Sequence, residues 1–199
     1  MSVGKIRTAL TFDDGPHPQT LELLKVLEEY RIPATFFQCG MYVRKYPEIA
    51  REVAASHQLG NHTNTHPWLW RTLPSKIREE ISVTQEIIQS ATNIRPQVFR
   101  PPYGVSGIGL KNTLQQHQLT NVLWTVIGND WKLPASKITQ RVLSHMKPDG
   151  IICLHDGRDV NPSPDIRETI EAVKQIIPAL LEQNYEFVTT GQLLNLPDQ

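Results

Sequence analysis

The sequence has no excess of charge of either sign. Lys plus Arg total 20 and Asp plus Glu total 20, so the 199 residues carry a formal net charge of zero at pH 7. Nucleic acids and anionic membranes attract proteins over long range through a basic excess, which this chain lacks. We therefore expect no nucleic-acid partner, and an uncharged substrate is compatible with the composition.

Long apolar runs are also absent. No stretch approaches the roughly 18 apolar residues that a transmembrane helix requires. Residues 1–10 lack the long apolar segment of a secretory signal peptide. We therefore expect no membrane insertion and, for the chain as given, a cytoplasmic location.

Cysteine is scarce too. The two cysteines, Cys39 and Cys153, each lie in an apolar stretch. This placement favours two buried, reduced thiols over a disulfide, although spacing alone cannot place their Cα atoms.

The sequence contains no internal repeat, low-complexity segment or Gly/Ser-rich linker, so residues 1–199 are predicted to form one domain. Short apolar runs alternate with segments of helical periodicity. Strands are predicted at 7–12, 34–39, ending at 60–61, and at 97–99, 122–126, 151–154 and 187–188. Helices are predicted at 20–30, 47–56, 75–90, 110–117, 136–146 and from 165, with Asp165 and Glu168 as a capping box and Pro178 as a kink or end. This alternation indicates α/β architecture with parallel strands, either closing toward a barrel or, alternatively, forming an open doubly wound sheet.

Two adjacent carboxylates follow the first predicted strand, at Asp13 and Asp14. Neighbouring side chains of a continuing strand point to opposite faces. Both can face one site only if the strand stops there, and Gly15-Pro16 gives the chain the means to turn. A solvated turn is the structural alternative.

Two histidines four residues apart, His62 and His66, follow the third predicted strand. On one helical turn both imidazoles would reach the same ion, and Pro67 would end that turn. With Asp14 they supply two nitrogens and one oxygen, a set that leaves coordination positions open for catalysis. Zn²⁺ is favoured, and Co²⁺, Ni²⁺, Mn²⁺ or Fe²⁺ would also suit. A coincidental pair on a helix surface is the alternative.

Three further polar groups follow predicted strands: Arg100, the Asp130-Trp131 pair and His155. Each has a structural explanation, namely a surface arginine, a helix cap beside a core tryptophan, and a buried histidine. In parallel barrels, however, active-site groups gather at the C-terminal ends of the strands. Their occurrence at successive strand ends therefore favours a common site.

Five segments resemble, in order, the motifs of the polysaccharide deacetylase family (NodB-homology domain, carbohydrate esterase family 4). They are Thr-Phe-Asp-Asp-Gly-Pro at 11–16, His-Thr-Asn-Thr-His at 62–66, Arg-Pro-Pro-Tyr at 100–103, Asp-Trp at 130–131 and Leu-His-Asp at 154–156. The resemblance spans about residues 7–155. It implies a distorted (β/α)7-type barrel that binds a divalent metal ion. The implied activity is removal of acetyl groups from N-acetylated or O-acetylated carbohydrates such as chitooligosaccharide, peptidoglycan or xylan.

The resemblance also implies roles for individual residues. The metal ligands are Asp14, His62 and His66; the general base is Asp13, oriented by Arg100; the general acid is His155, partnered by Asp130; the backbone N–H of Tyr103 stabilises the oxyanion; and Trp131 and Leu154 contact substrate. Two positions depart from the pattern: Ile127 where relatives often carry Asp, and Cys153 where they often carry a Leu lining the acetyl pocket. Both departures bear on the choice of substrate.

Two other functions remain open. One is hydrolysis of a small non-sugar amide, as in other members of the wider superfamily. The second is a catalytically dead glycan-binding module, which would be expected to lack a ligand or the base, whereas this sequence retains both. The oligomeric state is not predicted, and the family is often extracytoplasmic, so the compartment stays open.

Overall fold

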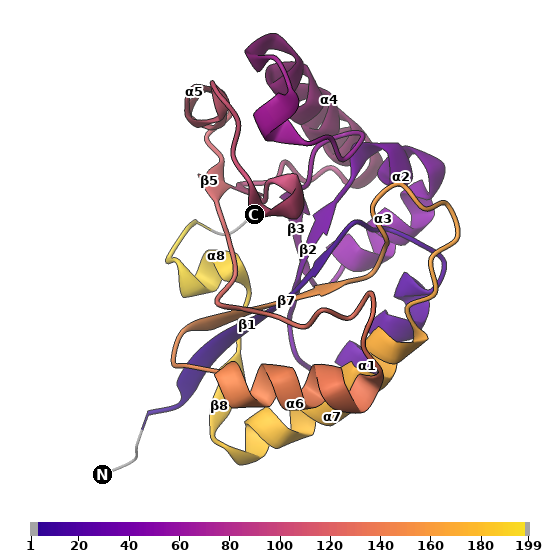
Figure 1. Cartoon of the computed structure of the whole chain (residues 1–199), viewed down its shortest axis with the longest axis vertical. Helices are drawn as coiled ribbons and strands as arrows, with labels where there is room; N and C mark the ends of the chain where they lie inside the picture. The colour runs from indigo at the N-terminus through magenta and orange to yellow at the C-terminus, as the bar shows by residue number, and fades with distance from the viewer. Residues whose placement is uncertain (1–3, 198–199) are drawn as a thin grey trace.

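The computed structural model describes residues 4–197 as one curled parallel sheet with helices around it (Figure 1). The strands are β1 (Ile6–Asp13), β2 (Thr35–Gln38), β3 (Gln58–Asn61), β4 (Val98–Phe99), β5 (Thr120–Asn121), β6 (Val126–Ile127), β7 (Gly150–His155) and β8 (Tyr185–Phe187). The helices are α1 (Thr20–Tyr30), α2 (Gly40–Lys45), α3 (Pro47–Ala54), α4 (Pro74–Thr92), α5 (Leu110–Gln116), α6 (Ala135–His145), α7 (Arg167–Glu182) and α8 (Thr190–Leu193), with short 3-10 turns η1 (Leu69–Arg71) and η2 (Pro102–Gly104).

The sheet order is β5-β4-β3-β2-β1-β7-β6, with β8 paired to the start of β1, and every pairing is parallel. Because β5 and β6 lie at the two ends of this order, the curled sheet does not close. The fold is therefore the distorted (β/α)7-type barrel that the motifs imply, with an opening between β5 and β6, and the doubly wound alternative is not favoured.

The predicted strand at 122–126 is largely wrong, because this segment crosses from one edge of the sheet to the other and only Val126 lies in a strand, β6. The N–H of Val122 donates to Phe99 on one side, and the N–H of Thr125 donates to Ile151 on the other. Only the two-residue strands β5 and β6 remain at the edges. The apolar run in the sequence predicts extended backbone, but it cannot indicate that the segment bonds to β4 at its start and to β7 at its end.

The core lies between the outer face of the sheet and the helices. Leu10 and Phe12 of β1 belong to it and are fully buried, as are Ile176 and Ile177 of α7. Figure 1 shows α1, α6 and α7 along β1 and β7, and α2, α3 and α4 around the other part of the sheet. Burying each such side chain contributes about 1.5–3 kcal/mol, so the helices are fixed mainly by packing.

Most predicted helices are found, but α2 and α8 were missed and the start of α7 was predicted wrongly. The Glu168 carboxylate does not cap α7; it accepts the N–H of Ala135, the first residue of α6, at 2.6 Å. Asp165 accepts the N–H of Arg167 and pairs with its side chain. Pro178 does not end α7, which continues to Glu182 because buried side chains on both sides of the proline hold it to the sheet.

Both cysteines are buried and free, which confirms the expectation of reduced thiols. Among residues 4–197, no helix has both the length and the apolar character needed to cross a bilayer.

Candidate active site

The carboxyl ends of the strands meet around a cavity of about 610 Å³. Of the residues predicted from sequence, those that line it are Asp13, Asp14, His62, His66, Tyr103, Trp131 and His155. Two more, Arg100 and Asp130, are fully buried directly behind this lining, where they contact Asp13 and His155. The structure thus brings the predicted groups together, with Leu154 as the exception.

The adjacent carboxylates Asp13 and Asp14 both face the cavity because β1 ends at Asp13. Asp14 has a φ of 77°, in the left-handed region, which breaks the alternation of the strand. At Gly15 the chain passes so close to Asp156 that an added Cβ would collide with its carboxylate. Asp156 instead accepts the N–H of Gly15 and the hydroxyl of Thr20, which fixes the turn.

The predicted metal ligands converge on one atom. Oδ1 of Asp14 lies 3.2 Å from Nε2 of His62 and 3.2 Å from Nε2 of His66. All three residues are buried, with relative exposures of 5%, 2% and 6%. Among the described residues, this buried oxygen has no aligned hydrogen-bond donor. A buried carboxylate oxygen facing two imidazole nitrogens fits a divalent cation bound between them.

The other nitrogens of the two imidazoles face different partners. Nδ1 of His62 donates to the carbonyl of Arg100 at 2.7 Å, which leaves Nε2 free for a metal ion. Nδ1 of His66 lies 2.6 Å from Oδ1 of Asp159, close but without the alignment of a hydrogen bond. The segment 62–66 is not the helical turn that we expected, because Thr63 and His66 have left-handed φ values of 67° and 55°. These two bends bring the rings within 5.1 Å of each other.

Asp14 is set up to remain ionised. Burial alone would raise the pKa of its carboxyl group, but the contacts with His62 and His66 and the positive field of His155 hold that pKa well below its usual value. A carboxylate that stays charged near neutral pH suits a metal ligand.

Asp13 is held by a fully buried arginine. Nη1 of Arg100 donates to Oδ1 of Asp13 at 2.7 Å and to the hydroxyl of Thr11 at 2.7 Å. Its Nε donates to the carbonyl of Val122 at 3.0 Å, and the guanidinium lies over the ring of Phe37. The guanidinium is thereby fixed from several sides and presents one N–H to the carboxylate.

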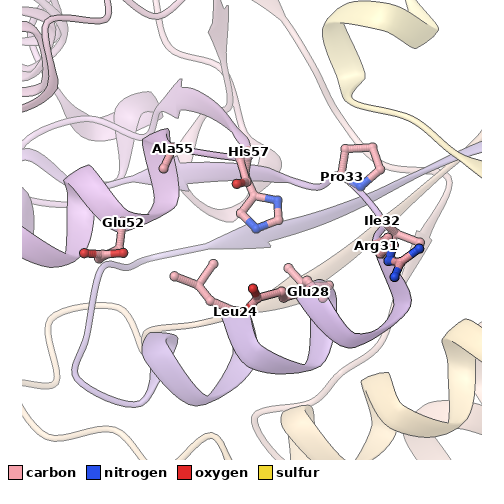
Figure 2. A pocket seen from close by; sticks show the side chains of 10 residues that line it. Leu24, Glu28, Arg31, Ile32, Pro33, Glu52, Ala55 and His57 are labelled. Carbon is pink, nitrogen blue, oxygen red and sulfur yellow. The ribbon is translucent and has the colours of Figure 1, made fainter.

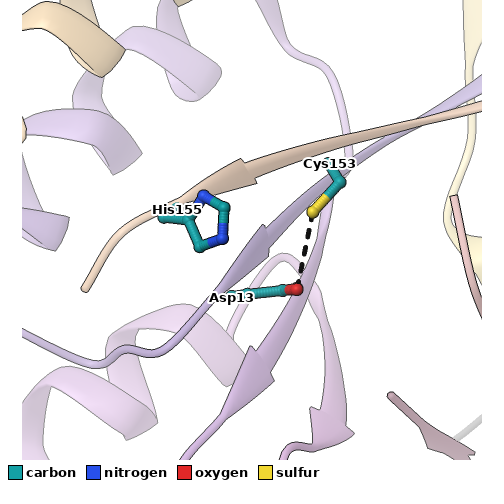
Figure 3. Close-up of side chains that lie close together, drawn as sticks. All are labelled: Asp13, Cys153 and His155. Atoms are coloured by element: carbon teal, nitrogen blue, oxygen red, sulfur yellow. Dashed lines mark hydrogen bonds between the residues drawn. The ribbon is translucent and has the colours of Figure 1, made fainter. Parts of the chain in front are cut away.

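The other oxygen of Asp13 faces a thiol. Figure 3 shows Asp13, Cys153 and His155 close together, with Sγ of Cys153 donating to Oδ2 of Asp13 at 3.5 Å. These three side chains could in principle hold a metal ion. Burial and the nearby Asp13 charge, however, raise the pKa of the Cys153 thiol well above its usual value. With the thiol protonated and Arg100 already paired with Asp13, this cluster is better explained by hydrogen bonding.

His155 forms a dyad with Asp130. Its Nδ1–H donates to Oδ1 of Asp130 at 2.8 Å, and its backbone N–H donates to Oδ2 at 2.8 Å. Thr169 of α7 also donates to Oδ2. Burial would lower the pKa of His155, but the Asp130 charge outweighs it and raises the pKa to about 9. His155 is therefore protonated at neutral pH and has a proton to give.

Aromatic side chains form the walls of the cavity. Trp131 is 42% exposed and stands edge-on to His155, with ring centroids 5.2 Å apart. Across the cavity lining, Tyr103 stacks on Trp68 at 3.6 Å. Trp124, from the crossing segment between β5 and β6, completes this set. Flat apolar faces of this kind suit sugar rings.

The prediction that Leu154 contacts substrate is wrong. Leu154 is fully buried in the core and does not line the cavity. Strand alternation explains this: Cys153 and Leu154 point to opposite faces of β7, and Cys153 is the one that reaches Asp13.

Other lining residues were missed because they lie outside the motifs. Asp159 and Arg158 come from the loop after β7, and Trp68 comes from the segment after the two histidines. The sequence held a partial signal for Trp68, an aromatic residue two positions after His66. For Asp159 it held none, because the loop has no regular period that would place a side chain.

A second cavity of about 490 Å³ lies between α1 and the end of α3 (Figure 2). Its lining includes His57. Burial lowers the pKa of His57 to about 4, so the imidazole is neutral at pH 7. Within residues 4–197, neither of the side-chain groups suited to a metal ion lies at this cavity.

Comparison with known proteins decides the family. The sequence pattern of the polysaccharide deacetylase family matches residues 2–122. A chitooligosaccharide deacetylase of Bradyrhizobium sp. (strain ANU 289) is 37% identical over 194 residues, covering 92% of this chain and 89% of the relative. The chain belongs to the polysaccharide deacetylase family.

Two further matches support this membership. A peptidoglycan-N-acetylglucosamine deacetylase of Bacillus cereus is 35% identical over 191 residues, covering 93% of this chain and 67% of the relative. The solved structure of the Bc1960 peptidoglycan N-acetylglucosamine deacetylase, in complex with a naphthalenyl N-oxidanyl-benzamide, is similar with a TM-score of 0.91 at 33% identity and covers 98% of this chain and 91% of that one. This polysaccharide deacetylase is thus a hydrolase of a metal-dependent family that acts on acetylated carbohydrates.

Proposed function

We propose that the chain is a Zn²⁺-dependent N-deacetylase of β-linked N-acetylglucosamine glycans, with chitooligosaccharides as the first substrates to test and peptidoglycan as the second. The observation that carries the proposal is the arrangement in one cavity of an Asp-Arg pair, an Asp-His-His set and a His-Asp dyad. These three units match the separate tasks of base, metal site and acid in amide hydrolysis.

The metal site is assigned to Asp14, His62 and His66, whose ligand atoms all lie within 4.8 Å of one another. A divalent cation there would polarise water and the acetyl carbonyl and supply positive charge where the oxyanion develops. Zn²⁺ is proposed because two imidazoles and one carboxylate are its usual catalytic ligands. The same donors also suit Co²⁺, Ni²⁺, Mn²⁺ and Fe²⁺.

Asp13 is the proposed general base. Its Oδ1 is fixed by Arg100, so the carboxylate cannot rotate away from the cavity when it accepts the proton of the attacking water. The guanidinium of Arg100 is itself fully buried and places its positive charge directly beside this carboxylate.

His155 is the proposed general acid. Asp130 holds its Nδ1, which leaves Nε2–H directed to the departing group. An amine is a poor leaving group without a proton, and the raised pKa of His155, about 9, keeps that proton available at neutral pH. Tyr103 is proposed to donate its backbone N–H to the oxyanion, from a residue held in the left-handed region at φ 60°.

Two other functions receive less support. A small cyclic amide would leave much of the 610 Å³ cavity and its tryptophans without contacts. A catalytically dead module has no need to retain the base, the acid and all three ligands together in contact with their partners.

A substrate panel with metal control tests the proposal. Metal-free protein is prepared with a chelator, and acetate release is measured from chitooligosaccharides, peptidoglycan, acetylated xylan and a small cyclic amide. We expect no acetate without metal, recovery with Zn²⁺ or Co²⁺, and the highest kcat/KM on chitooligosaccharides. Full activity in metal-free protein, or turnover of the cyclic amide alone, would refute the assignment.

A further inference from the structure

Asp159, in the loop between β7 and α7, contacts two of the proposed metal ligands, His66 and Asp14, and also Tyr103. Its Oδ1 lies 2.6 Å from Nδ1 of His66. Its Oδ2 accepts the hydroxyl proton of Tyr103 at 2.9 Å. Its backbone N–H donates to Oδ2 of Asp14 at 2.7 Å. No sequence motif contains this residue.

The backbone at Asp159 is unusual for a residue with a side chain. Its φ is 48°, in the left-handed region, which costs an ordinary residue about 1 kcal/mol or more and which Asn and Asp tolerate best. This conformation directs the N–H and the carboxylate of one residue to neighbouring parts of the same site. The loop therefore reaches the metal centre through both its main chain and its side chain.

A carboxylate beside the outer nitrogen of a metal-binding imidazole has a known physical effect. It favours the proton on that nitrogen, leaves the other nitrogen free to bind metal, and increases the ligand's basicity. His62 has a neutral carbonyl in this position, from Arg100. Asp159 offers His66 a charged partner instead, so the two histidine ligands are supported unequally.

Asp159 also connects the metal centre to the proposed oxyanion donor. The ring of Tyr103 lies against that of His66 at 4.7 Å, and its hydroxyl is held by Asp159. One carboxylate thereby contacts both side chains. A shift of this carboxylate would move a metal ligand and the backbone N–H of Tyr103 together.

We propose that Asp159 is a positioning residue that orients His66 for metal binding and couples this ligand to Tyr103. The inference rests on the proposed function, since it assumes that Asp14, His62 and His66 bind a metal ion.

The test compares two variants of Asp159 with a matched control. Asp159→Asn keeps the shape and tolerates the positive φ but removes the charge. Asp159→Gly removes the side chain, and glycine adopts the positive φ without strain, whereas alanine at this position would be strained. The control is Asp165→Asn, in the same loop, whose exposed carboxylate pairs with Arg167 and contacts no site residue.

Zn²⁺ affinity is measured by calorimetry on the metal-free proteins. We expect Asp159→Gly to weaken binding about 10- to 100-fold, Asp159→Asn to weaken it less, and Asp165→Asn to match wild type. Thermal unfolding of the metal-free variants shows whether each is folded. No Zn²⁺ binding by wild type would refute the metal centre and with it this inference. Equal binding by wild type and Asp159→Gly would refute the inference alone.

A spectroscopic measurement separates orientation from general loss of structure. In the Zn²⁺-loaded protein, the Nδ1–H proton of His66 should give a downfield, slowly exchanging NMR signal, assigned by its loss in His66→Gln. We expect this signal to vanish in Asp159→Gly and to persist in Asp165→Asn and in Tyr103→Phe, which removes only the phenol contact. A His66 signal unchanged in Asp159→Gly would refute the orienting role, even if metal affinity fell.

Discussion

Replacing Arg100 by Ala should damage stability and catalysis together, because this side chain is fully buried and serves both. Its guanidinium donates to Asp13, Thr11 and the carbonyl of Val122. Without this guanidinium, the buried carboxylate of Asp13 loses its positively charged partner, and the hydroxyl of Thr11 and the carbonyl of Val122 lose their hydrogen-bond donor. Breaking a buried pair from one side typically costs about 3–5 kcal/mol.

The corresponding shift in Tm is large for a chain of this size. Near 200 residues, each kcal/mol moves Tm by about 2–4 °C, so Arg100→Ala should lower it by roughly 6–20 °C. We expect kcat to fall by at least 10²-fold, because the base is no longer fixed. Zn²⁺ affinity should change much less, since His62 is held by the main-chain carbonyl of Arg100 and not by its side chain.

The assay combines thermal unfolding by circular dichroism, Zn²⁺ calorimetry and kcat measured well below the variant's Tm. Arg167→Ala is the matched control, because it removes an arginine from an ion pair that is exposed on the surface, and it should leave Tm nearly unchanged. A Tm within 2 °C of wild type for Arg100→Ala would contradict the reasoning on buried charge. A loss of Zn²⁺ binding as large as the loss of kcat, in protein shown to be folded, would assign Arg100 to the metal centre.

Three further predictions follow from the contacts around the cavity. Asp13→Asn should bind Zn²⁺ nearly normally and be almost inactive, whereas Asp14→Asn should lose both; calorimetry on the two variants checks this, and a reversed result would exchange their roles. Since the pKa of His155 is raised to about 9, its protonated pair with Asp130 stabilises the fold fully below about pH 6.5, and both this stability and kcat/KM should decline as pH rises through about 9. His155→Ala should remove the decline of kcat/KM at high pH and lower the rate about 10²-fold. An unchanged pH profile in this variant would exclude His155 as the acid. Leu154→Ala should cost about 2–5 kcal/mol in unfolding experiments and leave KM for chitooligosaccharides unchanged, because the side chain packs in the core; a raised KM with an unchanged Tm would restore it to the substrate site.

The candidate site was largely predictable because most of its residues stand at the carboxyl ends of predicted strands. A short apolar run that stops at a polar residue marks the carboxyl edge of a parallel sheet, and Asp13, Arg100 and His155 all stand at such points. Those rules give the edge and the residue types. The role of Leu154 came from the family motif instead, and strand alternation places its side chain on the opposite face from His155 and Cys153, in the core.

Contacts made by loops and by side chains from other elements were not predictable. Glu168 fits a capping box in its own segment, yet it accepts the N–H of Ala135, 33 residues earlier in the chain. Asp159 reaches Asp14 over 145 residues of sequence. Local pattern rules describe what a residue does within a few positions, and tertiary packing decides between such local bonds and distant ones.

The opening of the barrel and the position of the base have a common cause. In a closed barrel, a strand at 122–126 would bond its carbonyls to a neighbouring strand on each side. Here the segment crosses the gap, and the carbonyls of Val122 and Leu123 point to the guanidinium of Arg100, at 3.0 and 3.5 Å. The same guanidinium holds Asp13 at 2.7 Å. A regular strand at this place would satisfy its carbonyls within the sheet and leave Arg100 buried without enough acceptors, so the interruption of the sheet is what allows a buried arginine to fix the base.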